Sequence, residues 1–373
     1  MSAAGLLAIG AAGAAVLLLA LLDVFMTIFN YDGFTFLARR LHQVLWGALR
    51  RGTAWLPDRP RHAALSLGSA SMLPITLGFW LGLEISAFAM MFLPGLVAGW
   101  FTLTDGLGPG AGTAYYLSAG AISSLTFGDV VARTGLYQAL VDLETIIGLS
   151  TFTLALTYVL TAFGALSHLN TLHARVRRNT IEPSRPETIL ARHFQAGHAD
   201  RLPDLLAALV DDLEDYEQGL RRYPVVFYFH TRRLARSTPR IFTALGQLIE
   251  LLRWGLPAHE ALTRDPLLLA LLDGYDTTVD RLQHNFIGPE LPPAPEPASR
   301  EQFTGRDATE DDRGVAEFVD LRRRACEVAR LSAEDYDEDP SQEYQLYRDW
   351  LVFHHRHREF LQHLSDVLGY AHA

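Results

Sequence analysis

The chain of 373 residues contains no lysine, so all 32 of its basic residues are arginine. It has a single cysteine, Cys326, which excludes a disulfide within the chain and a cysteine-rich metal site. Charged residues make up only 20% of the chain and hydrophobic residues 49%. This balance indicates a membrane-embedded part joined to a soluble part. The all-arginine, alanine-rich and leucine-rich composition is typical of a GC-rich bacterial genome.

The charge divides the chain into two halves. Residues 1–178 carry 10 arginines and 8 acidic residues, a net charge of +2, whereas residues 179–373 carry 22 arginines and 34 acidic residues, a net charge of −12. Nucleic-acid binding needs a basic face, so we expect no nucleic-acid partner. We interpret the acidic excess as a means of keeping the second half soluble. The alternative is that it concentrates cations near a cation pathway.

Three apolar segments precede residue 170, and each is long enough to cross a hydrocarbon core of about 30 Å. They run over about Leu6–Phe29, Leu65–Val97 and Leu136–Leu166, and we expect Pro74 to break the second. A signal peptide is the alternative for the first segment. We favour a retained transmembrane helix, because no arginine precedes the apolar run and no clear cleavage motif follows it.

The arginines predict the orientation of these spans in a bilayer. Six lie between the first and second spans and three follow the third: Arg39, Arg40, Arg50, Arg51, Arg59, Arg61, Arg175, Arg177 and Arg178. The connection between the second and third spans holds only Arg133. The positive-inside rule therefore places residues 32–64 and everything after residue 170 in the cytoplasm of a bacterium. The N-terminus then lies outside the inner membrane.

The first cytoplasmic connection has apolar residues at helical spacing among the arginines: Phe36, Leu37, Leu41, Val44, Leu45 and Leu49. Such a pattern predicts an amphipathic helix lying in the membrane interface. Trp46 and Trp55 fit the headgroup level at which tryptophan is enriched.

The most informative segment is Tyr115–Val130, YYLSAGAISSLTFGDV, which lies between the second and third spans. The stretch Thr113–Ser123 is too short to cross a bilayer, which suits a helix that enters only partway. A polar, glycine-containing break follows it. Irregular backbone inside a membrane requires burial in protein or contact with water, so the pattern predicts a re-entrant pore loop.

The residues after this helix resemble the pore loop of the potassium-channel superfamily, in which an aromatic pore helix precedes T-T-V-G-Y/F-G-D. In this register Ser123 and Ser124 stand at the two threonines and Leu125 at the valine. The match continues with Phe127 at the aromatic position, Gly128 at the second glycine and Asp129 at the aspartate, whereas Thr126 replaces the first glycine. The resemblance covers about residues 75–168.

The resemblance implies a filter, here Ser124–Gly128, that replaces the water shell of a cation with rings of carbonyl oxygens from four loops. It also implies a homotetramer, K⁺ as the first candidate among permeant monovalent cations, and no cofactor. Thr126 departs from the pattern, because a left-handed residue other than glycine costs about 1–2 kcal/mol. Either its peptide has another orientation or the filter has fewer carbonyl sites. A further interpretation makes its hydroxyl a ligand.

The third span resembles the inner helix of the same family, and it contains Glu144, Gly148 and Thr151 as candidates for support or gating. A carboxylate in a span is a functional candidate by default. The structural interpretation has Glu144 near the outer interface, bonded to the pore helix or loop. Gly148 serves either as a bend or as a site of close packing. Four threonine hydroxyls after Gly148 either line a wet cavity, bond back to helix carbonyls or hold helices together: Thr151, Thr153, Thr157 and Thr161.

Acidic residues in the other two spans, Asp23 and Glu84, should face protein rather than lipid. The resulting domain division is residues 1–64 for the first span and the interfacial helix, 65–170 for the channel domain, and 171–373 for an acidic cytoplasmic domain with a proline-rich linker near 288–300. The whole chain is predicted to be an all-α membrane protein with three spans.

The cytoplasmic half has helical periodicity from residue 186 to 284, and two last helices are predicted near 313–331 and 342–370. The apolar run Tyr223–Phe229 is either a strand or a buried connector. No Gly-x-Gly-x-x-Gly motif follows a strand, so a nucleotide-binding regulatory domain is not supported.

Metal binding is not predicted in this half. Asp335, Asp337 and Asp339 have the spacing of the first ligands in a calcium-binding loop. However, Pro340 stands where such a loop needs a glycine, and Leu346 stands where it needs a bidentate glutamate. Four histidines near the C-terminus are interpreted as a solvated face, with a proton sensor as the alternative; they are His354, His355, His357 and His363.

No nucleophile–base pair or metal-hydrolase motif occurs, so we do not expect an enzyme. The leading hypothesis is a tetrameric cation channel whose gate is influenced by the cytoplasmic domain. The alternative is a non-conducting membrane receptor or scaffold that retains the pore-loop fold, with Thr126 marking a degenerate filter.

Overall fold

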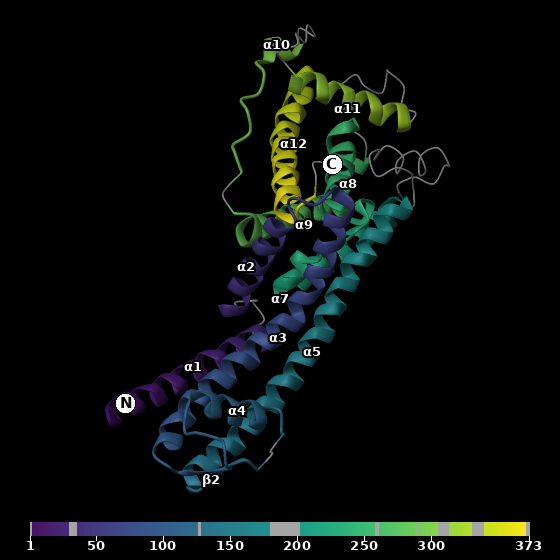
Figure 1. Cartoon of the computed structure of the whole chain (residues 1–373). Coiled ribbons are helices and arrows are strands. Elements are labelled where there is room, and N and C mark those ends of the chain that lie inside the picture. The colour runs from purple at the N-terminus through teal and green to yellow at the C-terminus, as the bar shows by residue number, and fades with distance from the viewer. Residues whose placement is uncertain are drawn as a thin grey trace. The chain divides into compact units, whose positions relative to one another are not determined.

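A computed structural model of the chain (Figure 1) describes residues 2–29, 36–125, 128–179, 202–257, 261–288, 291–304, 313–329 and 339–370. Over these residues the fold is helical apart from one two-stranded sheet, which confirms the predicted all-α class. Four of the candidate residues named in the sequence analysis lie outside the described residues: Thr126, Phe127, Asp335 and Asp337.

The chain forms two compact units. Unit 1 comprises residues 1–57, 64–164 and 220–229, and unit 2 comprises residues 58–63, 165–219 and 230–373. Each is described by itself below.

Three helices of the chain are long and apolar enough to cross a membrane, as predicted. They are α1 (Ala3–Phe29), α3 (Asp58–Val97) and α5 (Gly135–Asn179), the last over Gly135–Val176. α3 continues through both Pro74 and Pro94, so the expected break at Pro74 is wrong. A proline removes one backbone hydrogen bond, but an apolar helix packed against neighbours can tolerate that loss in a membrane.

α1 and α3 pack closely through a small residue. A Cβ added to Gly13 would lie 2.6 Å from the carbonyl oxygen of Ala87, so only glycine permits this approach. Around the contact lies an apolar cluster that includes Leu17, Phe88 and Phe92. Small residues at helix contacts are the usual means by which spanning helices approach one another.

Asp23 of α1 fixes the start of α2 (Leu37–Gly52). Its carboxylate accepts hydrogen bonds from the backbone N–H groups of Leu37 (2.8 Å) and Ala38 (3.2 Å) and from Nε1 of Trp80 (2.9 Å). These bonds satisfy donors that a helix leaves open at its N-terminus, where negative charge is favoured. Asp23 is 1% exposed, which confirms that it faces protein.

α2 is the helix predicted for the first connection, but one of the two tryptophans expected at the headgroup level is placed otherwise. Trp46 is buried, with its ring 5.9 Å from that of Tyr228, so it is not free for the lipid headgroup level. His42, one turn earlier on the same face, is also buried, and burial lowers its pKa to about 4. Trp55 is exposed and still fits the headgroup level. The interfacial position of α2 stays a prediction.

The segment between residues 220 and 229 joins unit 1. It contains a buried 3-10 helix, η2 (Pro224–Tyr228), so the buried connector is confirmed and the strand is wrong. Besides the contact of Tyr228 with Trp46, the ring of Tyr223 lies 5.6 Å from that of Tyr158.

The connection between α3 and α5 carries the remaining elements of unit 1. They are β1 (Phe101–Leu103), α4 (Ala111–Ile122) and β2 (Val130–Ala132), and β1 pairs antiparallel with β2 in the register Phe101 to Ala132. The sequence predicted no strand here, because three residues are too few to display an alternating pattern. Because β1 pairs with β2, the two ends of the connection between α3 and α5 lie next to each other.

Unit 2 begins with residues 58–63 of α3 and 165–179 of α5. Its other helices and helical turns are α7 (Leu202–Arg222), whose last three residues belong to unit 1, η3 (Leu234–Arg236), α8 (Thr238–Glu250), the π-helical turn η4 (Leu251–Gly255), η5 (Ala261–Arg264), α9 (Pro266–Leu282), the π-helical turn η6 (Gln283–Ile287), α10 (Arg300–Thr304), α11 (Arg313–Ala329) and α12 (Pro340–Leu368). The two predicted C-terminal helices are thereby confirmed. Residues 291–299 form no regular element, as expected of a proline-rich linker. Asp339 caps α12 by accepting the N–H of Ser341 at 3.0 Å.

The histidines of α12 do not form the solvated face that we expected. His357 is buried where α12 crosses α8, with Nδ1 2.5 Å from the hydroxyl of Tyr275. Gly246 of α8 makes room for this ring, since a Cβ there would lie 2.5 Å from Nδ1 of His357. His354, one turn earlier, is half-buried and bonded to Glu250.

Candidate functional site

The predicted pore segment begins with α4, which is held between α3 and α5 by polar contacts. The hydroxyl of Ser118 lies 2.9 Å from the carbonyl oxygen of Ile85 in α3 and within hydrogen-bond distance of Oε1 of Glu144 in α5. Ser118 and Glu144 are both fully buried. In the sequence analysis, the structural interpretation of Glu144 was a bond to the short helix or the loop, and the structure contains such a contact with the helix.

A second buried carboxyl group lies on α3. Oε1 of Glu84 accepts a hydrogen bond of 2.7 Å from the hydroxyl of Thr151 on α5, and Glu84 is fully buried. Thr151 thus faces α3 rather than a wet cavity. Within the part of the chain that the structure describes, Oε2 of Glu84 and Oε2 of Glu144 are buried without a hydrogen-bond partner. Unit 1 therefore has two buried carboxyl groups among the mostly apolar contacts between α3, α4 and α5.

Three threonines that follow Thr151 along α5 are exposed. Thr153, Thr157 and Thr161 are exposed on the single chain, and each hydroxyl donates to the carbonyl oxygen four residues earlier, at 2.8, 3.0 and 3.0 Å. These bonds are the ordinary way in which threonine satisfies its hydroxyl inside an apolar helix.

Gly148 lets the end of α4 reach α5. A Cβ added to Gly148 would lie 2.7 Å from the carbonyl oxygen of Ile122, the last residue of α4. At 1.5 Å per residue, Gly148 lies about 20 Å along α5 from its first residue.

The backbone after α4 turns sharply. The N–H of Ser124 donates to the carbonyl of Ala121 (3.0 Å), and the N–H of Leu125 donates to that of Gly120 (2.8 Å). This pair of bonds is a Schellman motif, whose turning residue is left-handed and usually glycine. Here it is Ser124, with φ +58°. A left-handed residue other than glycine costs about 1–2 kcal/mol, so the turn is strained.

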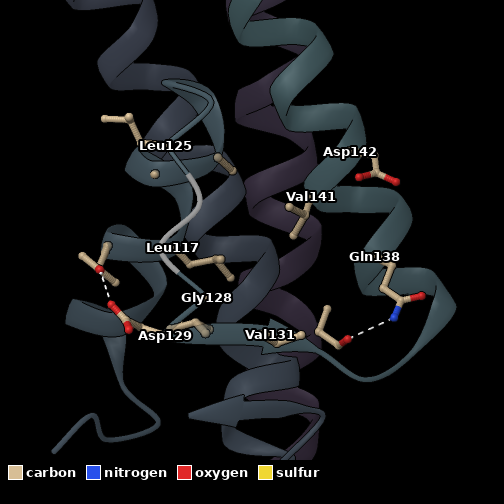
Figure 2. A pocket seen from close by; sticks show the side chains of 13 residues that line it. Leu117, Leu125, Gly128, Asp129, Val131, Gln138, Val141 and Asp142 are labelled. Carbon is tan, nitrogen blue, oxygen red and sulfur yellow. Dashed lines mark hydrogen bonds between the residues drawn. The ribbon is translucent and has the colours of Figure 1, made fainter. Parts of the chain in front are cut away.

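The other end of the loop is anchored to α4. Gly128 has φ +77°, a conformation that favours glycine. Next to it, Oδ2 of Asp129 accepts a hydrogen bond of 2.8 Å from the hydroxyl of Tyr116, and its carbonyl oxygen accepts the N–H of Thr104 at 3.0 Å. The tyrosine–aspartate bond is drawn in Figure 2.

Behind the loop lies a cavity of about 270 Å³. Figure 2 shows Leu117 of α4 with Leu125 and Gly128 of the loop on one side and Val141 of α5 on the other. Most of the residues that line the cavity are apolar. At its edge Nε2 of Gln138 donates to the carbonyl of Ala132 at 3.1 Å.

The structure brings together most of the residues that the sequence singled out. Ser123, Ser124, Leu125, Gly128 and Asp129 form the described part of the loop. Glu144, Gly148 and Thr151 share the buried face of α5, at a spacing of four and three residues that suits one side of a helix.

Three contributors were missed by sequence reasoning: Tyr116, Ser118 and Ile122. The signals were present, since Tyr116 belongs to the aromatic start of the short helix and Ser118 is a polar residue inside an apolar one. The partner of Tyr116 lies 13 residues away in the sequence and that of Ser118 lies 26 residues away, so the sequence alone could not predict these contacts.

In comparisons with protein-family models, curated proteins and solved structures, the chain matches none.

Proposed function

We propose that this protein is a homotetrameric cation channel of the inner membrane of a bacterium, with the loop Ser123–Asp129 as its filter. Monovalent cations pass down their gradient, K⁺ first among them, and unit 2 influences the gate. The loop resembles the potassium-channel filter in its aromatic residue, second glycine and aspartate, Phe127, Gly128 and Asp129.

The observation that carries the proposal is the course of the chain between α3 and α5. α4 is too short to cross a bilayer, ends against Gly148 inside α5, and is followed by a loop that returns to β2, which pairs with β1 at the start of the connection. A chain that enters and leaves on one side is what a re-entrant pore loop requires. Buried bonds to Ile85 and Glu144 would hold α4 in place during conduction.

The outer face of α5 supports assembly of several copies. It exposes apolar side chains in every turn on the single chain, namely Leu149, Phe152, Leu156, Leu160 and Phe163. A face of this kind requires lipid or protein next to it. One loop per chain cannot close a ring of carbonyls, so four copies are needed for a filter. The arginine distribution supports an orientation with the N-terminus outside and the residues after 170 in the cytoplasm.

The experiment that tests the proposal is a current measurement with the purified full chain in planar bilayers, with K⁺ on one side and Na⁺ on the other. A reversal potential near the K⁺ equilibrium value indicates a selective filter in spite of Thr126, and one near zero with clear current indicates a nonselective cation pore. Absence of current at every voltage, pH and calcium concentration overturns the channel and favours the receptor or scaffold. Bilayers without protein are the control.

A further inference from the structure

Unit 2 contains a groove of about 550 Å³ between α8, η4, α11 and α12. This volume is within the range of about 300–1,000 Å³ that is usual for small-molecule sites. Leu251, Leu321 and Leu361 give the groove an apolar part, and polar side chains from α8, α11 and α12 line the rest. All residues that line the groove belong to unit 2.

The acid and the histidines of the groove are already engaged. Oε1 of Glu250 lies 3.0 Å from Nδ1 of His354, whose Nε2 lies 3.4 Å from Glu317. Burial alone would lower the pKa of His354, but its hydrogen bond to Glu250 and the charges of Glu250 and Glu317 raise it overall. Burial lowers the pKa of His357 to about 4, so this ring is neutral near pH 7. None of these groups is available to neutralise a ligand.

Two arginines, Arg324 and Arg358, also line the groove, and they differ in their ion-pair partners. Nε of Arg324 lies 2.9 Å from Asp320. Arg358 forms no ion pair among the residues that the structure describes, although it lies in a half of the chain with a net charge of −12. A guanidinium group at the wall of a groove, with no carboxylate against it, is a site for a carboxylate or a phosphate.

A third feature of the wall is an unsatisfied acceptor. Oε1 of Gln247 on α8 is buried and, within the described parts of the chain, has no hydrogen-bond partner. A buried carbonyl oxygen without a donor costs about 1–3 kcal/mol, a cost that a ligand N–H or O–H group would remove.

We propose that this groove binds a small organic anion, a carboxylate or phosphate on an apolar body. Arg358 holds the anionic group, the leucines contact the apolar body, and Gln247 accepts a hydrogen bond from the ligand. The proposal concerns binding to unit 2 and holds whether or not unit 1 conducts.

The test is isothermal titration calorimetry on the full chain in lipid nanodiscs, with empty nanodiscs subtracted. Phenyl phosphate and phenylacetate are the anionic probes, and benzyl alcohol is the neutral probe of similar shape. We expect at least one anion to bind with a submillimolar dissociation constant, and benzyl alcohol at least tenfold more weakly. The comparison of the two anions distinguishes a phosphate ligand from a carboxylate.

Arg358→Gln should raise the dissociation constant of the bound anion at least tenfold. Arg348→Gln removes the same charge from an exposed position on the same helix and should leave the dissociation constant unchanged. Leu361→Trp, which fills the groove, should abolish binding of both anions while the melting temperature shows that unit 2 remains folded. Failure of both anions to bind at millimolar concentration, or equal binding to Arg358→Gln and the unaltered chain, overturns the proposal.

Discussion

Gly148 of α5 lies directly against the backbone of Ile122 at the end of α4, so that a Cβ on Gly148 would come within 2.7 Å of the Ile122 carbonyl oxygen. The position of the loop after α4 therefore depends on the absence of a single methyl group. Of the two roles considered for this glycine, close packing accounts for the contact.

Gly148→Ala should push α4 away from α5. Overpacking of this kind costs about 1–3 kcal/mol, so we expect a lower melting temperature and, in bilayers, a lower current or altered selectivity. Gly164→Ala in the same helix is the matched control, because nothing lies within 4 Å of the added Cβ and alanine favours a helix over glycine. Equal melting temperatures for the two variants would contradict the prediction.

Asp23→Asn should loosen the start of α2. An amide offers one acceptor oxygen where the carboxylate offers two, and its NH₂ group faces the N–H groups of Leu37 and Ala38. We expect the free energy of opening at the start of α2 to fall by about 1–3 kcal/mol, measured as faster hydrogen exchange at these two amides. Trp80→Phe removes one donor to Asp23 but leaves the backbone bonds, so exchange there should change less. Unchanged exchange in Asp23→Asn would show that the cap is not needed.

Tyr116→Phe should release one end of the loop. The variant removes the hydroxyl that donates a hydrogen bond of 2.8 Å to Oδ2 of Asp129. We expect a smaller permeability ratio of K⁺ to Na⁺ in bilayers. Tyr115→Phe, one residue earlier, removes a hydroxyl that forms no hydrogen bond among the described residues, and should leave the ratio unchanged. The same ratio in both variants would exclude this role of Tyr116.

Thr126→Gly separates the two functional hypotheses. Glycine restores the residue of the family pattern, and it adopts a left-handed backbone conformation at less cost than a β-branched residue. A working channel should change its reversal potential under K⁺ and Na⁺, towards the K⁺ equilibrium value. A receptor should stay silent or gain conductance. A current identical to that of the unaltered chain would mean that residue 126 does not contribute to the filter.

The buried His357 predicts a pH dependence of unit 2. Burial lowers its pKa to about 4 in the folded chain, against about 6.5 in the unfolded chain, so folding favours the neutral ring. Its contribution to stability is complete above pH 6.5 and is lost as the pH falls towards 4. The loss is about 3 kcal/mol at most.

The measurement is the melting temperature between pH 7 and pH 4 for the unaltered chain, His357→Gln and His363→Gln. The glutamine at position 357 should flatten the decrease, and the substitution on the same helix at position 363 should not. Parallel curves for all three proteins would assign the acid sensitivity to other groups.

The length of the apolar runs sufficed to locate the three helices that are long and apolar enough to cross a membrane. The first was predicted over Leu6–Phe29 and is Ala3–Phe29 in the structure, because a run without charge has few alternatives to a helix. The expected break at Pro74 failed because a single missing N–H is a small loss in a helix of 40 residues. Local pattern also located α11 and α12.

Contacts between distant residues could not be predicted. Nothing near Asp23 reveals that it caps a helix 14 residues later, and nothing near Gly148 names Ile122 as its neighbour. Trp46 looked interfacial because its own helix is amphipathic. Its burial depends on Tyr228, far along the chain. At the candidate site, the sequence predicted the loop residues, whereas the bonds that position them required the fold.

The segment at residues 220–229 has a consequence for how this gene can be divided. The chain passes between its two units five times, at residues 57/58, 63/64, 164/165, 219/220 and 229/230. End-to-end fusion of two ready-made modules would need one passage. A stop codon after residue 164 therefore removes ten residues from the unit it is meant to preserve. Recombination at a single crossover would likewise divide one unit or both, so the two halves of this protein are expected to be inherited together.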